Sequence, residues 1–190
     1  LLFSGRREDA GGVTLESQTV ENGVLTALDR GQVRNLDLDV ISGRMYAAGP
    51  GWIESVRQGG FAMASSLAGA PTATVTQRPQ ELTFVRVDFQ QAITGQSFAK
   101  DFSQWKITFH ESVETVLGPV SRWEERLSAD SPGGLGPRGM LLTSRELSIA
   151  QMGVSPEGEP HMELLATGRP HIESLSFTAD GERLSYDGAK

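Results

Sequence analysis

Asp37 and Asp39 stand two residues apart in a segment where acidic and apolar residues alternate. Residues two apart on a β-strand point to the same face, so these carboxylates would lie side by side. Paired carboxylates can bind calcium or carry out acid–base chemistry. Neither an Asp/Asn-rich loop nor a third nearby acid accompanies them. A solvated strand face is therefore the favoured interpretation.

The three histidines, His110, His161 and His171, are the other candidates for metal or proton chemistry. None belongs to an H-x-H or H-x-x-x-H pair, although His161 and His171 could ligate a metal across a hairpin. The chain has no cysteine, which excludes thiol catalysis and disulfides. No G-x-S-x-G elbow surrounds a serine. We predict no enzymatic activity, no catalytic residue, no cofactor and no bound metal.

A literal G-x-G-x-x-G stands at residues 134–139. A dinucleotide site needs a strand before this motif and a helix N-terminus after it. The preceding stretch, 128–132, is rich in small residues, and a strand pattern follows. A loop is the favoured interpretation.

The alternating segments predict an all-β protein. Leu36, Leu38 and Val40 alternate with Asp37 and Asp39, and similar alternation recurs at 85–89, 105–109 and 172–177. Turns are predicted at 29–31, 94–95 and 180–181, and a bend or stop at 49–51. Helix is expected only at 60–68 and at 121–127, and 121–127 is ambiguous between helix and strand. Such short strands suit a sandwich, a jelly roll or a β-solenoid.

The whole chain, residues 1–190, is interpreted as one β region and as a portion of a longer protein. Internal repeats are expected near 13–56 and 141–190, since both contain a Gly turn followed by Ile-Glu-Ser, at 53–55 and 172–174. The net charge is −7 and no Lys/Arg run is present, so no nucleic acid is expected as a partner. No apolar stretch approaches membrane-spanning length.

The apolar alternators allow two interpretations. They fill an ordinary β core, or they line a groove between two sheets where acyl chains replace the missing core. The groove candidates are Val87, Phe89, Ile107, Phe109, Leu175 and Phe177.

The C-terminal segment resembles a known family. Residues 177–187, FTADGERLSYD, are similar to the repeated F-x-A-D-x-x-x-Y-D phrase of the OstA-like domain of lipopolysaccharide-transport proteins of the LptA and LptC type. Residues 163–173 resemble the A-x-G-x-x-x-I-E strand of that family. Residues 142–149, LTSRELSI, resemble its L-x-S/A-D-x-L-x-V phrase, with Arg145 at the usual Asp position. The resemblance covers the last 50 residues well and residues 13–127 more loosely.

The resemblance implies a half-open, twisted β jelly roll, or β-taco, built of successive antiparallel hairpins. It implies a non-enzymatic periplasmic module of the bacterial cell envelope that serves outer-membrane biogenesis. Such a module holds the acyl chains of lipopolysaccharide or another acyl lipid and stacks end to end with other OstA-like domains. Weakly charged edge strands suit that stacking, and the candidate interface residues are Val13, Leu15, Leu184 and Tyr186.

Two other classes of function stay open at this level. A structural β module of a long envelope or surface protein would have a filled core and no ligand. A carbohydrate-binding jelly roll would need an exposed aromatic platform, for which Trp52, Trp105 and Trp123 are the candidates.

Overall fold

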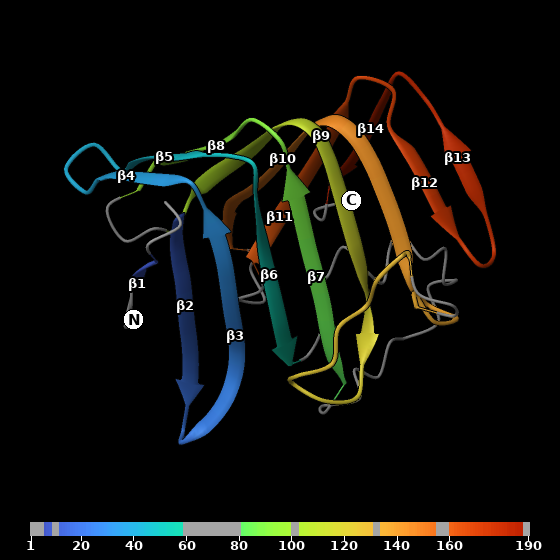
Figure 1. Cartoon of the computed structure of the whole chain (residues 1–190), viewed down its shortest axis with the longest axis horizontal. Helices are drawn as coiled ribbons and strands as arrows, with labels where there is room; N and C mark the ends of the chain where they lie inside the picture. The colour runs from blue at the N-terminus through green and yellow to red at the C-terminus, as the bar shows by residue number, and fades with distance from the viewer. Residues whose placement is uncertain are drawn as a thin grey trace.

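The computed structural model describes residues 6–8, 12–58, 81–99, 103–130, 134–154 and 160–187. Within these residues all regular secondary structure is β-strand, arranged as one antiparallel 14-stranded sheet. This confirms the all-β prediction and an open, twisted sheet of successive hairpins (Figure 1). The strands are β1 (Arg6–Glu8), β2 (Gly12–Glu21), β3 (Val24–Val33), β4 (Asn35–Asp39), β5 (Arg44–Ala48), β6 (Gly51–Gln58), β7 (Leu82–Phe89), β8 (Ala92–Ser97), β9 (Trp105–Val120), β10 (Met140–Val154), β11 (Pro160–Thr167), β12 (His171–Ser174), β13 (Thr178–Asp180) and β14 (Arg183–Asp187).

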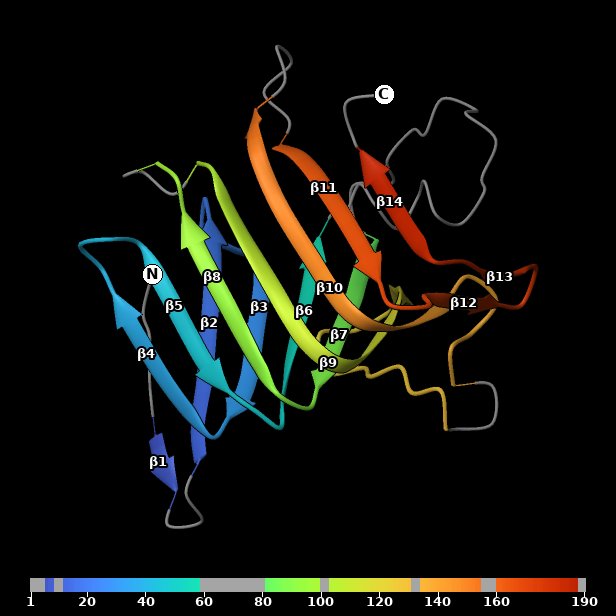
Figure 2. The ribbon, with the colours of Figure 1, turned by 90° about the horizontal axis from the view of Figure 1, so that it is seen from above.

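The sheet folds into two layers because β9 and β10 each serve both. In the first layer the order is β1-β2-β3-β6-β7-β9-β10-β12-β13, using residues 114–120 of β9 and 140–144 of β10. In the second layer the order is β4-β5-β8-β9-β10-β11-β14, using the other halves of β9 and β10. In Figures 1 and 2, β2, β3, β6 and β7 lie together in one layer, and β4, β5 and β8 turn away from them into the other.

A crease separates the layers, and the chain crosses it at residues that can break a regular ladder. Gly49-Pro50, a cis peptide, lies between β5 and β6. Glu111 and Ser112 have φ values of 60° and 50° within β9, and the register with β10 shifts between Ser144 and Glu146. Backbone bonds continue across the fold, including Gly49 N to Gln91 O at 2.6 Å. The bend or stop predicted at 49–51 is therefore a crossing of this crease.

The main core lies between the two layers. Side chains alternate along each strand, so one face of every strand points inward. The buried inward residues are Val33, Ala47, Val87, Phe89, Ile93, Phe109, Val113, Leu117, Met140, Leu142, Leu147, Leu164, Ala166 and Ile172. Phe89 and Phe109 meet across the crease with ring centroids 5.9 Å apart.

A second, smaller core lies on the outer face of the first layer. It contains Val56, Leu82, Phe84, Val116, Val120 and Leu127. The irregular segment that links β9 to β10 covers these side chains with Trp123, Leu127 and Leu135. The two expected states of 121–127, helix or strand, are both wrong, since bends, a turn and irregular chain occupy it. The described part of 134–139 is also irregular, so the G-x-G-x-x-G has no helix behind it.

Two predicted turns are wrong, and the reason is the same for both. Gly31 lies inside β3, where a Cβ atom would come within 2.5 Å of Ile53 Cδ1. Gly95 lies inside β8, where a Cβ atom would come within 3.0 Å of Met45 Cε. These glycines permit close packing between layers or neighbouring strands and do not reverse the chain. The turn between β13 and β14 is confirmed, and the helix expected at 60–68 lies outside the described residues.

The last alternating run, 172–177, is not one strand. β12 ends at Ser174, and a turn closed by Ser174 N to Phe177 O at 2.9 Å leads to β13. Across the described ranges we find no helix with the length and apolarity to traverse a bilayer.

Candidate functional site

The inward face of the second layer changes from buried to exposed with distance from the crease. Ala47, Ile93, Phe109 and Leu147 form the row beside the crease and are at most 5% exposed. The next row contains Met45, Ile107 and Ile149, which are only partly buried, and Leu164 on β11, which is 3% exposed. Leu38, at the end of this row, is 50% exposed. The first row is therefore closed from β5 to β10, whereas the second row is only partly covered over the same strands.

Five of the six predicted groove residues lie in or against this interior. Val87, Phe89 and Phe109 are buried core residues. Ile107 and Phe177 are partly buried and pack against them. Leu175 does not join them, because it lies in the turn after β12 and is 80% exposed. We call the partly buried row formed by Met45, Ile107 and Ile149 the rim row.

The inward face of the first layer is apolar over β7 to β12, whereas β3 and β6 carry polar as well as apolar side chains there. Asp29, Ser55 and Arg57 all point inward there. The Ser55 hydroxyl donates to Asp29 Oδ1 at 2.5 Å, and Arg57 Nη2 donates to the same oxygen at 3.1 Å. Within the described residues, the buried hydroxyls of Thr115 and Ser144 have no hydrogen-bond partner. The space between the layers is therefore lined mainly by apolar side chains, with a polar cluster contributed by β3 and β6.

The strand order ends at β4 and β14 in the second layer and at β1 and β13 in the first. Two of the predicted interface residues, Leu184 and Tyr186, lie in β14 and pack against the interior. Val13 and Leu15 lie in β2, and β1 pairs with β2 only over Gly12–Thr14. Of the two predicted edges, the C-terminal one is the end strand β14. The N-terminal one is β2, which β1 partly covers.

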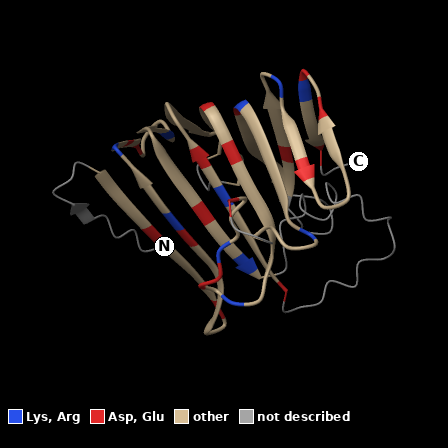
Figure 3. Ribbon diagram, turned by 45° about the vertical axis from the view of Figure 1, so that its right-hand side comes forward, with Lys and Arg blue, Asp and Glu red and all other residues tan. Residues whose placement is uncertain are grey.

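The outer face of the first layer carries a row of alternating charges. Glu16, Arg30, Glu54 and Arg86 stand opposite one another on β2, β3, β6 and β7. Figure 3 shows acidic and basic bands on neighbouring strands. Arg30 contacts Glu16 at 3.4 Å and Glu54 at 3.8 Å, and Arg86 contacts Glu54 at 3.8 Å. Each acid is thus flanked by a base, which is favourable across a sheet.

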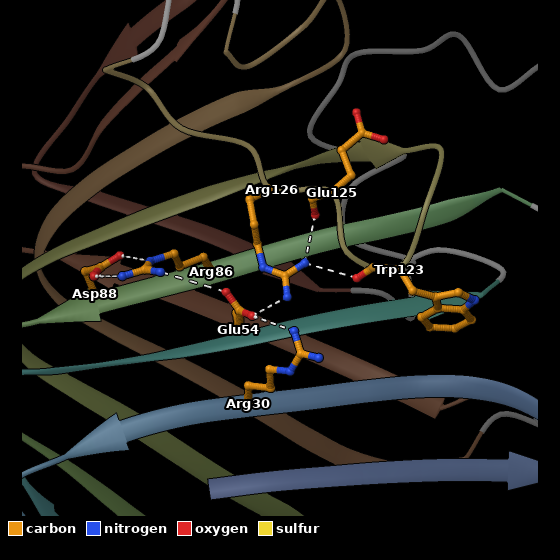
Figure 4. Close-up of polar contacts among 7 residues, drawn as sticks. All are labelled: Arg30, Glu54, Arg86, Asp88, Trp123, Glu125 and Arg126. Carbon is orange, nitrogen blue, oxygen red and sulfur yellow. Dashed lines mark hydrogen bonds and ion pairs between the residues drawn. The ribbon is translucent and has the colours of Figure 1, made fainter. Parts of the chain in front are cut away.

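Glu54 is the buried member of this row, at 5% exposure. Arg126, from the segment that covers the second core, donates to Glu54 at 2.7 Å (Figure 4). Its other nitrogen, Nη1, donates to the carbonyl oxygens of Trp123 and Glu125, each at 3.0 Å. A buried carboxylate needs such compensation. The contact between Arg126 and Glu54 therefore fastens the covering segment to the sheet.

Arg86 connects this cluster to Asp88 and Trp52. Its Nε and Nη2 donate to the two oxygens of Asp88 at 2.7 and 2.9 Å, and its guanidinium lies 4.7 Å from the Trp52 ring centroid. The hydrogen bond to Asp88 raises the pKa of Arg86 above its usual range. No local sequence motif indicates this cluster, because strand pairing alone brings its residues together.

Each histidine lies beside a carboxylate. His110 Nδ1 is 3.0 Å from Glu146, His161 Nε2 is 2.8 Å from Asp187, and His171 Nδ1 is 2.7 Å from Asp180. The partners are 36, 26 and 9 residues away in the sequence. Sequence reasoning missed these pairs because only strand register places them opposite one another. His161 and His171 lie on different layers and do not form the metal pair considered from the sequence.

A hydroxyl, an imidazole and a carboxylate stand in line on the second layer. Thr94 Oγ1 is 2.8 Å from His110 Nε2, and His110 Nδ1 is 3.0 Å from Glu146. This is the order of groups in an acyl-transfer triad. Thr94, however, lies inside β8 between β5 and β9. Amide groups there point to ladder partners and do not converge on an oxyanion.

His161, Glu163 and Asp187 form the one group of ligating side chains found among the described residues, with ligand atoms within 4.8 Å of one another. All three are partly exposed, on β11 and β14. Asp37 and Asp39 point outward from β4, as a solvated strand face requires. Asp39 accepts from the Ile41 and Ser42 amides and from the Ser42 hydroxyl. These bonds, that of the Ser42 hydroxyl first, lower the pKa of Asp39 below its usual 3.8.

The three tryptophans do not form one aromatic platform. Trp52 stacks with Arg86 on the outer face of the first layer, Trp123 packs on the second core, and Trp105 begins β9 in the second layer. Comparison of the chain with protein-family models, with curated proteins and with solved structures finds no match. Function is therefore inferred from the inter-layer interior and from the outer faces.

Proposed function

We propose that this chain is a non-enzymatic module of the bacterial cell envelope, located in the periplasm, which holds the acyl chains of lipopolysaccharide or another acyl lipid between its two layers. The resemblance of residues 142–149, 163–173 and 177–187 to the OstA-like domain supports this assignment. The folded, open sheet is the architecture that the resemblance implies.

The rim row carries the proposal. Met45, Ile107 and Ile149 point inward and are apolar, yet they are only partly buried, whereas the row beside the crease is closed. An apolar side chain that faces its own interior without being covered loses hydrophobic stabilisation of about 25 cal/mol per Å² left in water. An acyl chain lying along the rim row would cover this surface and recover that free energy.

A filled structural module is the competing function, and one observation favours it. Phe89 and Leu147 are completely buried, so the crease itself has no space for a ligand. The two functions make different predictions only for the rim row, since a structural module requires no ligand over these side chains.

A photo-crosslinking residue placed at Ile107 tests the proposal, with Glu173 as the control. Ile107 points to the inter-layer interior, whereas Glu173 is exposed on the outer face of the first layer. We expect the Ile107 probe to capture purified lipopolysaccharide and the Glu173 probe to capture little. Equal capture at both positions, or no capture at Ile107 by lipopolysaccharide or by a phospholipid, would overturn the lipid proposal.

We further propose that the module stacks end to end with another OstA-like domain. The support is topological, since β14 ends the second layer and an end strand accepts a further strand by ladder bonding. Arg183 is the only basic residue in β14, so the strand carries little of the positive charge that blocks such pairing.

Proline variants test this contact. Neighbouring amides on a strand point to opposite sides, so one of Leu184→Pro and Ser185→Pro removes a donor to β11 and the other removes an outward donor. The variant that keeps the parent's thermal stability should lose association in size-exclusion chromatography. Unchanged association of that variant would show that β14 is not the interface.

A further inference from the structure

We propose that the outer face of the second layer carries a saccharide-binding hollow built around Tyr46. The hollow encloses about 550 Å³, within the range of small-molecule sites. Most of its lining lies on the face opposite the proposed lipid interior, although Met45 of the rim row also contributes to it. The polar and charged side chains that line it are Asp37, Asp39, Arg44, Tyr46, Thr94, Gln96, Lys106 and Thr108.

Two neighbouring rows of the sheet supply these residues. Asp37, Tyr46, Thr94 and Thr108 stand opposite one another on β4, β5, β8 and β9. Asp39, Arg44, Gln96 and Lys106 form the next row on the same strands. The hollow is therefore a continuous patch that four paired strands hold in place.

Tyr46 provides the aromatic surface that a sugar ring needs. Its side chain is 47% exposed, although the residues before and after it, Met45 and Ala47, point into the interior. An exposed aromatic ring presents an apolar face with a polar tip. The C–H face of a pyranose can pack on such a ring while its hydroxyls meet the surrounding polar groups.

The polar groups around Tyr46 match a polyhydroxylated ligand better than an anion or a lipid. Asp37 accepts hydrogen bonds, Lys106 and Arg44 donate them, and Gln96 and Thr94 can do both. The lining holds two acids and two bases, so it has no net charge to attract a phosphate. An acyl chain would leave these polar groups without partners, at a cost in free energy.

The floor of the hollow is held in position before any ligand arrives. The Thr108 hydroxyl is 2.9 Å from Ser148 Oγ, and Thr94 Oγ1 is 2.8 Å from His110. Glu146 in turn orients His110 at 3.0 Å. Preorganised partners lower the entropic cost of binding. The row Thr94–His110–Glu146 thus has a positioning role here that requires no chemistry.

Fluorine NMR tests the site, because the chain has only two tyrosines. Incorporation of 3-fluorotyrosine gives two resonances, which Tyr46→Phe assigns. Tyr186 packs against the inter-layer core and serves as the internal control in the titrations with soluble oligosaccharides. The probes are maltohexaose, cellohexaose and the hexamer of N-acetylglucosamine, each titrated to about 10 mM to cover weak binding. Phosphatidylcholine vesicles with and without lipopolysaccharide form a separate arm.

We expect at least one saccharide to shift the Tyr46 resonance saturably while the Tyr186 resonance stays in place. A soluble oligosaccharide that does so identifies a free glycan as the source, and a shift with lipopolysaccharide vesicles alone identifies a headgroup. Asp37→Asn and Lys106→Met should each weaken binding about tenfold, whereas Asp130→Asn, an exposed loop change, should not. No saturable Tyr46 shift with any probe, or equal shifts of both tyrosines with a soluble oligosaccharide, would overturn the proposal.

Discussion

The tripeptide Ile-Glu-Ser occurs in two strands that each follow a crossing of the crease, and its surroundings differ between them. Ile53-Glu54-Ser55 lies in β6 after β5, and Ile172-Glu173-Ser174 lies in β12 after β11. In both copies the isoleucine points to the inter-layer core and the glutamate points to the outer face. Yet Glu54 is 5% exposed and Glu173 is exposed.

The difference comes from what lies on each side of the strand. β6 is a central strand between β3 and β7, and the segment 121–139 brings Arg126 onto its outer face. β12 lies near the end of the layer, where only the short β13 follows it. On the inner face the order is reversed, since Ile172 is 3% exposed and Ile53 only partly buried. Burial of each face is thus decided independently.

The largest expected effect separates the two isoleucines. Ile172→Ala should lower the free energy of unfolding by about 3–4 kcal/mol, because it leaves a cavity in a closed part of the core. Ile53→Ala should cost about 1–2 kcal/mol, because its site is partly open. Urea denaturation measures both. Equal losses would contradict the difference in inner-face burial.

The glutamates should show the opposite order. Glu54→Gln should cost about 2–3 kcal/mol, because it removes the charge that three arginines face on the buried side of β6. Glu173→Gln should change stability by less than about 0.5 kcal/mol. The same denaturation experiment compares them, and a larger loss for Glu173 would refute the assignment of Glu54 as the buried member.

A smaller effect is expected for the covering segment. Arg126→Ala should cost about 1–2 kcal/mol, through loss of the contact with Glu54 and of packing on Phe84, whose ring centroid is 5.7 Å away. Limited proteolysis within 121–139 should become faster. The control is Arg122→Ala, since Arg122 is exposed in the same segment. If both variants are cleaved at the parent's rate, Arg126 does not fasten the segment.

The smallest effect concerns the exposed turn between β4 and β5. The pKa of Asp39 is lowered in the folded state, so the bonds it accepts are present above its unfolded pKa and are lost as the pH falls through its folded pKa. An NMR titration of the Ser42 amide should give a midpoint below 3.8. Asp39→Asn should abolish that titration. A midpoint above 3.8 would contradict the capping role.

Alternation of side chains predicted several of the strands. The runs at 36–40, 85–89 and 105–109 correspond to β4, β7 and the start of β9, and the last two placed Val87, Phe89 and Phe109 in the core. Val40 was misplaced, since β4 ends at Asp39 and Val40 lies in the following turn, 82% exposed. Leu175 was misplaced because alternation cannot reveal a turn such as the one that ends β12 at Ser174. Gly31 and Gly95 were predicted to lie in turns, because the sequence does not distinguish a glycine that allows close packing from one that reverses the chain.

The sequence by itself determined that the chain forms strands, which residues share a face, and that most acids face water. The partners of those residues came from register alone, because strand pairing joins positions tens of residues apart. Glu54 with Arg126, His110 with Glu146, and Tyr46 with Lys106 across the hollow are not encoded in any local pattern. Only the tertiary structure decided which outward-facing side chains are buried, because their burial depends on whether a segment from a distant part of the chain packs over them.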